Sequence, residues 1–420
     1  MMKRYTLMFF LLLVIGSCSV AAINIVIDPF GAFGWCLPRT CTNRTEAFDD
    51  LRRTALVAAD RIHPSKIIVG SSTALTGLSF NDSGWDAPGP ARGMAVTGGT
   101  LQEAFWMVQY ANRTSQLQQV VLGLDFYMAN MRNQNRMDIP SHDPMAVARR
   151  YLELTFSKHA IQSSLASLHA KPFSPTIDDS GQQTIPPQFV AAQPGGFFGA
   201  FEAQELSYMT GNGWFAAGKG FDFVRDQYDS FAVFRALTRY CHEHHIRLYV
   251  YLSPSHARFF SALKLMGLEP YFLFWKAELA RINDEEARRT RKSAFPLWDF
   301  SVVSTLTTEP LPRVNGQAMT NFVDSSHFSS RVGTAILGCL FHPTIACDQF
   351  GALLRNDTFL MPHLEQSAHA LTDYMRSHST DLRDLQRLKD QAKSFLSDLP
   401  PPSEATTLRV EKFARENNLG

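Results

Sequence analysis

Three side chains in the sequence have the types that nucleophilic catalysis requires: a serine, a histidine and an aspartate. Asp324 and His327 are three residues apart, so on a helical turn they would lie on one face and meet. A neutral imidazole can take the proton of a serine hydroxyl, and a carboxylate can orient that imidazole. Ser72 follows a short apolar run and is the candidate serine. Taken alone, Asp324 and His327 are more typical of a solvated helix cap.

The elements that must bring these residues together are short apolar strands alternating with helices. This alternation predicts a doubly wound, three-layer α/β sandwich with a parallel sheet. Ligands bind beyond the carboxyl ends of such strands. Ser72 lies at one of these ends, and we expect His256 and Asp299 to reach the same crevice and contact substrate. The predicted strands cover residues 66–70, 93–96, 119–126, 247–252 and 295–300.

The chain divides into an N-terminal segment, a main domain and a tail. Its 420 residues have a formal net charge of +1 and are 45% apolar, which excludes a disordered chain and argues against nucleic acid as a partner. We expect an α/β domain over residues 35–356, and within it an insertion at about 130–220 that covers the strand ends. A helical stretch over 222–244 should precede the fourth strand, and residues 357–420 should form a helical tail.

The N-terminal segment has the features of a membrane anchor. Lys3 and Arg4 precede an uncharged run over residues 5–27, long enough to cross a bilayer. The basic residues would keep the N-terminus in the cytoplasm and place the body outside, in the periplasm. Residues 1–34 are therefore predicted to be a cytoplasmic start and signal anchor. Lipid attachment at Cys18 and cleavage after Ala22 are the alternatives.

Cysteine spacing agrees with export. Cys36 and Cys41 flank one short loop, and Cys339 and Cys347 flank another. Each pair fits a local disulfide in an oxidising compartment, although free buried thiols fit the sequence equally well. The spacing suits neither zinc nor a redox motif, and we expect no metal and no cofactor.

Three blocks of the sequence resemble one enzyme superfamily. Val69-Gly70-Ser71-Ser72, Val96-Thr97-Gly98-Gly99-Thr100 and Asp324-x-x-His327 occur in the order found in SGNH (GDSL-like) hydrolases. Further blocks, among them Asp28-Pro29-Phe30-Gly31 and Trp298-Asp299-Phe300, resemble the membrane-anchored branch related to alginate O-acetyltransferases. The resemblance covers roughly residues 25–342 in scattered blocks.

The resemblance implies a function and a role for each residue. Ser72 would be the nucleophile, and its N–H and that of Gly98 would form the oxyanion hole. His327 would be the base and Asp324 its orienting acid. The chain would be an anchored extracytoplasmic acyltransferase or esterase acting on O-acyl groups of an envelope or exported polysaccharide, with an acyl-donor partner in the membrane. The third block of the superfamily supplies an Asn, where this chain has Leu124-Asp125. A non-catalytic protein that binds polysaccharide or scaffolds a secretion complex is therefore the alternative.

Overall fold

The computed structural model describes most of the chain. The described residues are 2–35, 50–80, 84–85, 88–133, 135, 137–169, 173–210, 220–397 and 399–417. Cys36 and Cys41, and with them the first predicted disulfide, lie outside these residues. The second predicted disulfide is confirmed: Cys339 and Cys347 are joined, with their Cα atoms 5.8 Å apart.

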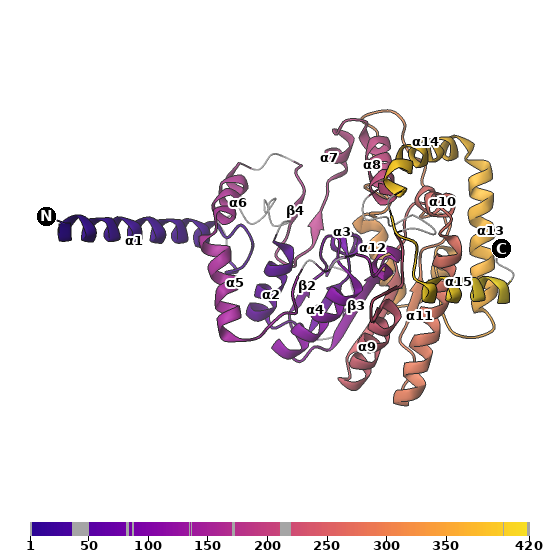
Figure 1. Ribbon diagram of the computed structural model, residues 1–420, viewed down its shortest axis with the longest axis horizontal. Helices are drawn as coiled ribbons and strands as arrows, with labels where there is room; N and C mark the ends of the chain where they lie inside the picture. The colour runs from indigo at the N-terminus through magenta and orange to yellow at the C-terminus, as the bar shows by residue number, and fades with distance from the viewer. Residues whose placement is uncertain are drawn as a thin grey trace.

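A six-stranded sheet forms the centre of the molecule (Figure 1). Five strands are parallel, and the last pairs antiparallel with its neighbour. The predicted mixed α/β fold with a mostly parallel sheet is confirmed, although the antiparallel edge strand was not predicted. In spatial order the strands are β10 (Ala352–Leu353), β9 (Leu297–Asp299), β8 (Arg247–Leu252), β3 (Gln119–Leu124), β1 (Lys66–Val69) and β2 (Ala91–Gly93).

The chain reverses its direction of travel across the sheet beside β1. From β1 it crosses to β2 on one side, and it then returns to β3 on the other side and continues to β8 and β9. All six positions of β3 are buried, which explains why this strand is a nearly continuous apolar run. Side chains that follow β1 and β3 therefore emerge at a topological switch point, where sheets of this kind bind their ligands.

Two groups of helices cover the sheet. In one group α2 (Leu51–Ile62) packs on α4 (Leu101–Thr114), and α4 packs on α9 (Ser230–Glu243). In the other group α3 (Ser72–Gly77) packs on α12 (Ser330–Phe341), and both contact strands of the sheet. The helices α10 (Ala257–Leu265) and α11 (Glu269–Thr290) connect β8 to β9, and the short helices η1 (Phe126–Ala129) and η2 (Ile345–Gln349) follow β3 and α12.

One predicted helix has different bounds in the structure. The helix predicted over 222–244 begins only at Ser230, because β6 (Val224–Arg225) and β7 (Tyr228–Asp229) form a hairpin before it. Asp226 makes the tight turn of this hairpin at φ 56°. Further upstream lie two consecutive helices, α5 (Pro144–Phe156) and α6 (Lys158–Leu168). Ser157 separates them and caps α6, since its Oγ accepts from the N–H of Ala160 at 3.0 Å.

The predicted insertion contains more than these two helices. It continues through the hairpin β4 (Thr176–Ile177) and β5 (Gln183–Thr184) to α7 (Pro187–Ala191) and α8 (Gly196–Thr210). The hairpin contacts α3, and α8 packs against the C-terminal region. The insertion therefore connects the anchor end of the molecule to the helix that begins at Ser72.

The C-terminal tail is helical, as predicted, and it is docked on the body. Its helices are α13 (Leu360–Ser377), α14 (Ser379–Leu396) and α15 (Glu404–Glu416). Leu364 and Leu385 are fully buried. Arg258 of α10 donates to the carboxylate of Asp381 at 3.2 Å. These contacts make the tail part of the packed structure rather than an appendage.

The N-terminal helix α1 (Met2–Ile27) extends away from the body (Figure 1). Residues Arg4–Ile27 are long and apolar enough to cross a membrane. The helix ends at Asp28, whose carboxylate accepts from the N–H groups of Ala32 at 2.7 Å and Gly34 at 2.9 Å. This turn satisfies backbone donors at the point where the chain leaves the helix.

Candidate active site

Ser72 lies at the carboxyl edge of the sheet because β1 ends three residues before it. Gly70 follows β1 at φ 150°, and a Cβ atom there would lie 2.8 Å from the carbonyl oxygen of Gly123, so a larger residue does not fit. Ser71 caps α3, since its Oγ accepts from the N–H of Thr73 at 3.3 Å. Ser72 is therefore the first residue of α3, and it is partly exposed.

Asp324 and His327 lie on a loop, so the prediction of a helical turn is wrong. Phe322 and Phe328 pair across the base of this loop as an isolated β-bridge. The carboxylate of Asp324 accepts from the N–H groups of Ser326 at 2.8 Å and His327 at 2.9 Å. An aspartate that captures following N–H groups in this way favours a turn over a helix. The loop still turns both side chains to the same side.

The fold brings the three predicted residues into one hydrogen-bonded chain. His327 Nε2 lies 2.8 Å from Ser72 Oγ, and His327 Nδ1 lies 2.7 Å from Asp324 Oδ2. Ser72 and His327 are 255 residues apart in the sequence. The side chains of His327 and Asp324 remain 15% and 20% exposed, so solvent still reaches this part of the site.

The electrostatics of the pair suit an imidazole that accepts a proton. Burial alone would lower the pKa of His327, but the charge and hydrogen bond of Asp324, together with Asp125, raise it overall. Burial alone would raise the pKa of Asp324, and the neighbouring His327 lowers it overall. Asp324 therefore stays ionised and stabilises the protonated form of His327.

Asp125 supplies a second carboxylate to the site. It follows β3, and Thr73 Oγ1 donates to it at 3.0 Å, while Ser71 Oγ also donates to it. Burial raises the pKa of Asp125, and the hydroxyl groups of Ser71, Ser253 and Thr73 oppose that shift. The hydroxyl of Ser71 is thus directed to a carboxylate, whereas that of Ser72 is directed to an imidazole. The two adjacent serines have different chemical environments.

The predicted oxyanion glycine lies in a loop beside the end of β1. Gly98 adopts φ 57°, a left-handed conformation that favours glycine. The N–H of Val96 donates to the carbonyl of Gly70 at 3.2 Å. A Cβ atom on Gly99 would lie 2.9 Å from the same carbonyl oxygen. The loop therefore packs against the residue before Ser71, and the oxyanion role of Gly98 stays a prediction.

His256 and Asp299 are fully engaged with the protein. The ring of His256 is buried, with Nε2 2.7 Å from the carbonyl of Glu309 and Nδ1 accepting from the N–H of Arg258. Its backbone N–H donates to the carbonyl of Ser325, which braces the loop that holds His327. Burial lowers the pKa of His256 to about 4, so the ring is neutral.

Asp299 lies in a buried ion-pair cluster. Its carboxylate contacts Lys276 Nζ at 2.8 Å and His363 Nε2 at 2.9 Å, and it also accepts from Ser301. Substrate contact by His256 and Asp299 stays a prediction, since their polar atoms already have protein partners.

Sequence reasoning did not find three further side chains that lie in or next to the site. Ser326 Oγ lies 3.2 Å from His327 Nδ1, and Gln204 Nε2 donates to Ser326 Oγ at 2.7 Å. Tyr208, one turn along α8, also bonds to Ser326. No motif marks Gln204 or Tyr208, because they lie about 120 residues before the loop that they contact.

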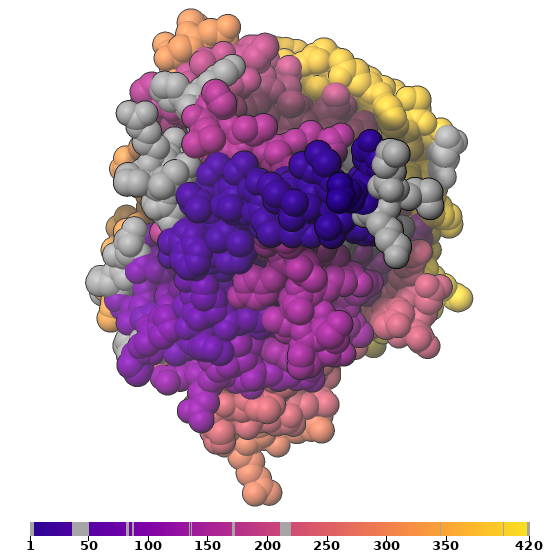
Figure 2. Space-filling model, turned by 90° about the vertical axis from the view of Figure 1, so that its left-hand side faces the viewer, coloured from indigo at the N-terminus to yellow at the C-terminus, as the bar shows by residue number. Residues whose placement is uncertain are grey.

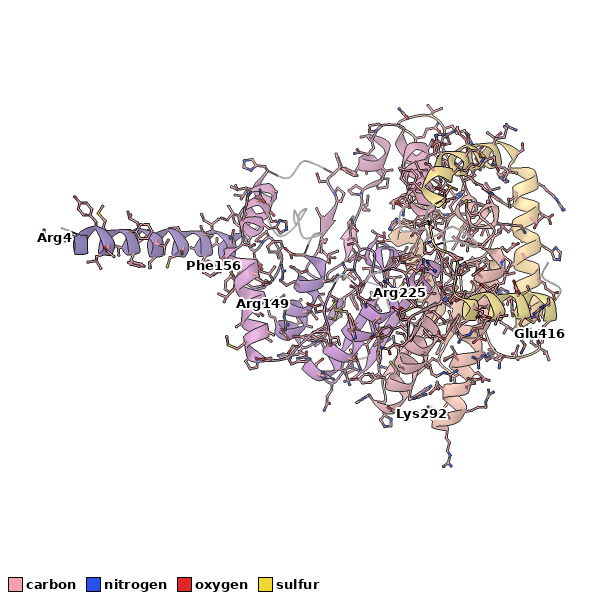
Figure 3. The ribbon with its side chains drawn as sticks, in the orientation of Figure 1. Arg4, Arg149, Phe156, Arg225, Lys292 and Glu416 are labelled. Carbon is pink, nitrogen blue, oxygen red and sulfur yellow. A yellow bond between two sulfur atoms is a disulfide. The ribbon has the colours of Figure 1, made fainter. Side chains whose placement is uncertain are left out.

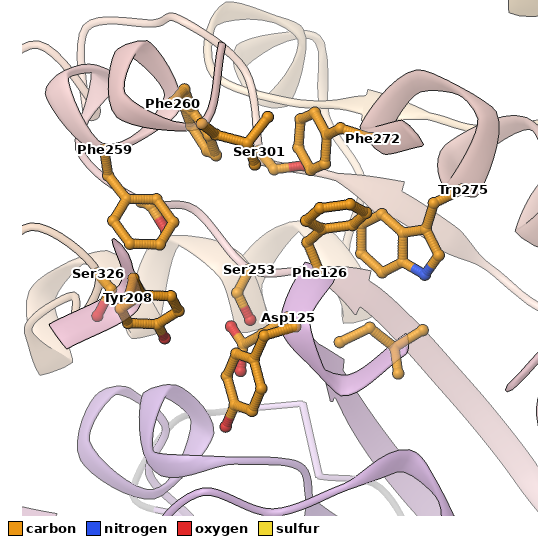
Figure 4. A pocket seen from close by; sticks show the side chains of 14 residues that line it. Asp125, Phe126, Tyr208, Ser253, Phe259, Phe260, Phe272, Trp275, Ser301 and Ser326 are labelled. Atoms are coloured by element: carbon orange, nitrogen blue, oxygen red, sulfur yellow. The ribbon is translucent and has the colours of Figure 1, made fainter. Parts of the chain in front are cut away.

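A small cavity lies beside these residues (Figure 4). Its polar lining groups include Asp125, Ser253, Ser301 and Ser326, and Tyr208 lines it near Ser326. The remaining walls are mainly aromatic and include Phe126, Phe259, Phe260, Phe272 and Trp275. A mainly aromatic cavity with a few polar groups suits a small, largely apolar ligand that carries a polar group.

The comparisons with known proteins assign the chain to no family. No family model, no curated protein and no solved structure matches the chain. Within the described residues, no group of three or more His, Cys, Asp or Glu side chains is placed to hold a metal ion.

Proposed function

We propose that the chain is a membrane-anchored serine esterase or O-acyltransferase whose body acts outside the cytoplasm. The observation that carries the proposal is the hydrogen-bonded chain from Ser72 through His327 to Asp324, with distances of 2.8 and 2.7 Å. This arrangement has the nucleophile, the base and the orienting acid of a serine acyl-transfer enzyme, each within hydrogen-bond reach.

The reaction proceeds in two balanced steps. His327 Nε2 takes the proton of Ser72 as Oγ attacks the carbonyl carbon of an ester, and the proton then passes to the departing alcohol. The product is an acyl group on Ser72 Oγ. In the second step a water molecule or an acceptor hydroxyl gives its proton to His327 and attacks the acyl carbon; the bond from the acyl carbon to Ser72 Oγ breaks, and His327 returns the proton to Oγ. Asp324 stabilises the protonated imidazole in both steps. The N–H groups of Ser72 and Gly98 are the proposed donors to the oxyanion.

The surroundings of the site support a short acyl group as one part of the substrate. The small cavity beside Asp125 supports a short acyl group, because its aromatic walls leave little room for a long chain. We propose O-acyl groups on an envelope or exported polysaccharide as the substrate, with a membrane partner as a source of acyl groups. The anchoring helix α1 supports a site near the membrane, and Lys3 and Arg4 at its start favour a cytoplasmic N-terminus.

Labelling with a fluorophosphonate tests the nucleophile. We expect the detergent-solubilised full chain to be labelled covalently and the Ser72→Ala variant to remain unlabelled. Ser71→Ala is the matched control and should still be labelled, because the hydroxyl of Ser71 is donated to Asp125 and not to an imidazole. Equal labelling of the wild type and Ser72→Ala would overturn the assignment.

A non-catalytic role is the second candidate, and Asp125 favours it. A carboxylate stands where the resemblance expects an amide donor, and an ionised carboxylate repels an oxyanion. A protein of this kind would bind polysaccharide or scaffold a secretion complex. The wild type would then resist fluorophosphonate, and Ser72→Ala would bind polysaccharide as tightly as the wild type.

A further inference from the structure

The strongly exposed apolar side chains of the body are concentrated on the insertion. Among the described residues outside α1, seven large apolar side chains that are about half exposed or more lie between residues 139 and 173. A soluble surface rarely gathers so many apolar groups in one place without a partner. The five that lie on α5 and α6 are called here the apolar platform: Met145, Leu152, Phe156, Leu165 and Leu168.

The exposed face of α5 carries three large apolar side chains, with one charged residue, the exposed Arg149, between them. Met145, Leu152 and Phe156 are seven and four residues apart, so they lie on one side of the helix, and they are 76%, 55% and 48% exposed. Leu154 and Thr155 on the opposite side are buried against the body. Large apolar groups on an exposed helix face favour a second apolar environment on the outside, and the long side chain of Arg149 can extend its charge to the headgroup level.

The end of the anchoring helix is joined to these two helices. Asn24 of α1 is fully buried, and its Nδ2 donates to the carbonyl of Thr155 in α5 at 2.7 Å. Ser164 of α6 donates to Asn24 Oδ1 at 2.7 Å. Because both polar ends of the amide are bonded, α1 leaves the body at a defined point on the α5–α6 pair.

The length of α1 places this joint at a membrane surface. Residues 5–23 form 19 helical positions without a charge, or about 28 Å, which is close to the roughly 30 Å of a bilayer core. Asn24 would then lie where the helix leaves the hydrocarbon. Trp35, which is 55% exposed and donates to the carbonyl of Ile25 at 2.7 Å, lies at the same level. Tryptophan is enriched at this depth of membranes.

The views of the molecule place the platform on the side from which α1 emerges. In Figure 1 α5 lies across the direction of α1 at that end of the body, and in Figure 3 Phe156 is labelled beside the junction. Figure 2 looks onto this side, where the magenta α5–α6 region borders the indigo N-terminal segment. A bilayer crossed by α1 would therefore face the platform.

We propose that α5 and α6 lie on the outer surface of the bilayer that α1 crosses, with the apolar platform inserted at the level of the headgroups. The inference rests on the anchoring part of the proposed function and not on catalysis. The exposed Lys158 at the start of α6 suits anionic headgroups. Two contacts with the membrane, instead of one helix alone, would fix the height and orientation of the crevice that contains Ser72.

Fluorescence quenching in vesicles tests the contact with lipid. The full chain is reconstituted in vesicles of phosphatidylcholine and phosphatidylglycerol, with an environment-sensitive fluorescent amino acid in place of Leu152. The matched control carries it in place of Leu408 on α15, which is 53% exposed against 55% for Leu152. We expect nitroxide-headgroup lipid to quench position 152 at least about two-fold more strongly than position 408.

A third labelled position separates failure of the anchor from failure of the platform. The same amino acid in place of Val14 in α1 reports insertion through quenching by acyl-chain nitroxides. Quenching at Val14 with equal, weak quenching at Leu152 and Leu408 would overturn the proposal. A blue-shifted but unquenched signal at Leu152 would show that protein covers the platform, which overturns it as well. Absence of quenching at Val14 would refute the anchor and this inference together, whereas the fluorophosphonate result for Ser72 would stand.

Discussion

Two Asp–His pairs with nearly the same separation lie in different regions of this molecule. Asp324 and His327 are 2.7 Å apart at the carboxyl edge of the sheet, and Asp299 and His363 are 2.9 Å apart beneath the C-terminal helices. In the first pair, the other ring nitrogen of the histidine faces Ser72 Oγ. In the second, the carboxylate also binds Lys276, which neutralises its charge.

The difference shows that an Asp–His contact does not by itself make a catalytic site. The pKa of Asp299 lies well below its usual value even though burial opposes this, because Lys276 and His363 both stabilise the ionised form. Burial in turn lowers the pKa of Lys276, and Asp299 opposes that shift. The Asp299 pair joins α11, β9 and α13 as a structural ion-pair cluster. The Asp324 pair differs in two ways: the free ring nitrogen of its histidine faces a hydroxyl group, and its carboxylate is 20% exposed where that of Asp299 is fully buried.

Removal of each histidine should separate the two pairs most clearly. His327→Ala should lower kcat for p-nitrophenyl acetate by roughly 10³- to 10⁶-fold, because the base that activates Ser72 is lost. His363→Ala should leave kcat within about two-fold of the wild type, because His363 contacts no reacting atom. Release of p-nitrophenol by the full chain in detergent measures both. Similar losses in the two variants, with folding verified by circular dichroism, would contradict the distinction.

The orienting acid should matter less than the base. Asp324→Asn should lower kcat by roughly 10²- to 10⁴-fold and leave a measurable remainder, because Asp324 positions and stabilises His327 without forming a bond to substrate. The double variant Asp324→Asn/His327→Ala should be no slower than His327→Ala alone, since the residues act as one unit. Additive losses in the double variant would indicate that Asp324 acts independently of His327.

Lys276 should affect stability and leave catalysis unchanged. Lys276→Met leaves Asp299 buried with its main cationic partner removed, which should lower the free energy of unfolding by about 3–5 kcal/mol. The turnover number per folded molecule should stay the same. Urea denaturation followed by tryptophan fluorescence measures the first quantity. The exposed pair of α13 provides the control, because Arg376→Met should change the free energy of unfolding by less than about 1 kcal/mol.

The pH dependence of the rate should show the smallest of these effects. The neutral form of His327 is the base, so the rate should rise with pH as this ring loses its proton. Because its pKa is raised above the ordinary 6.5, the midpoint should lie above that pH. Asp125→Asn should move the midpoint to lower pH, since Asp125 helps to raise the pKa of His327. The exposed Asp373 is the control: Asp373→Asn should leave the midpoint in place, and a midpoint unmoved by Asp125→Asn would show that Asp125 is protonated there.

Much of the fold and part of the candidate site follow from local sequence patterns. The buried runs at β1, β3 and β8 were found because strands covered on both faces must be apolar throughout. Elements with weaker patterns were missed or displaced. β10 has two residues, too few for any period, and the hairpin before α9 lies within a stretch whose spacing also suits a helix.

The sequence by itself determined the apolar N-terminal helix, the alternation of strands and helices, and the residues Ser72, Asp324 and His327 as candidates for chemistry. Local physics suffices for these, because hydrophobic length, periodicity and residue type are properties of neighbouring positions. Only the tertiary structure decided that Ser72 faces His327, that Ser71 faces Asp125, and that Asp299 forms an ion pair with Lys276. Each of these contacts joins segments far apart in the chain. Their geometry depends on which strands are adjacent in the sheet and how the loops beyond them pack, and no short stretch of sequence contains that information.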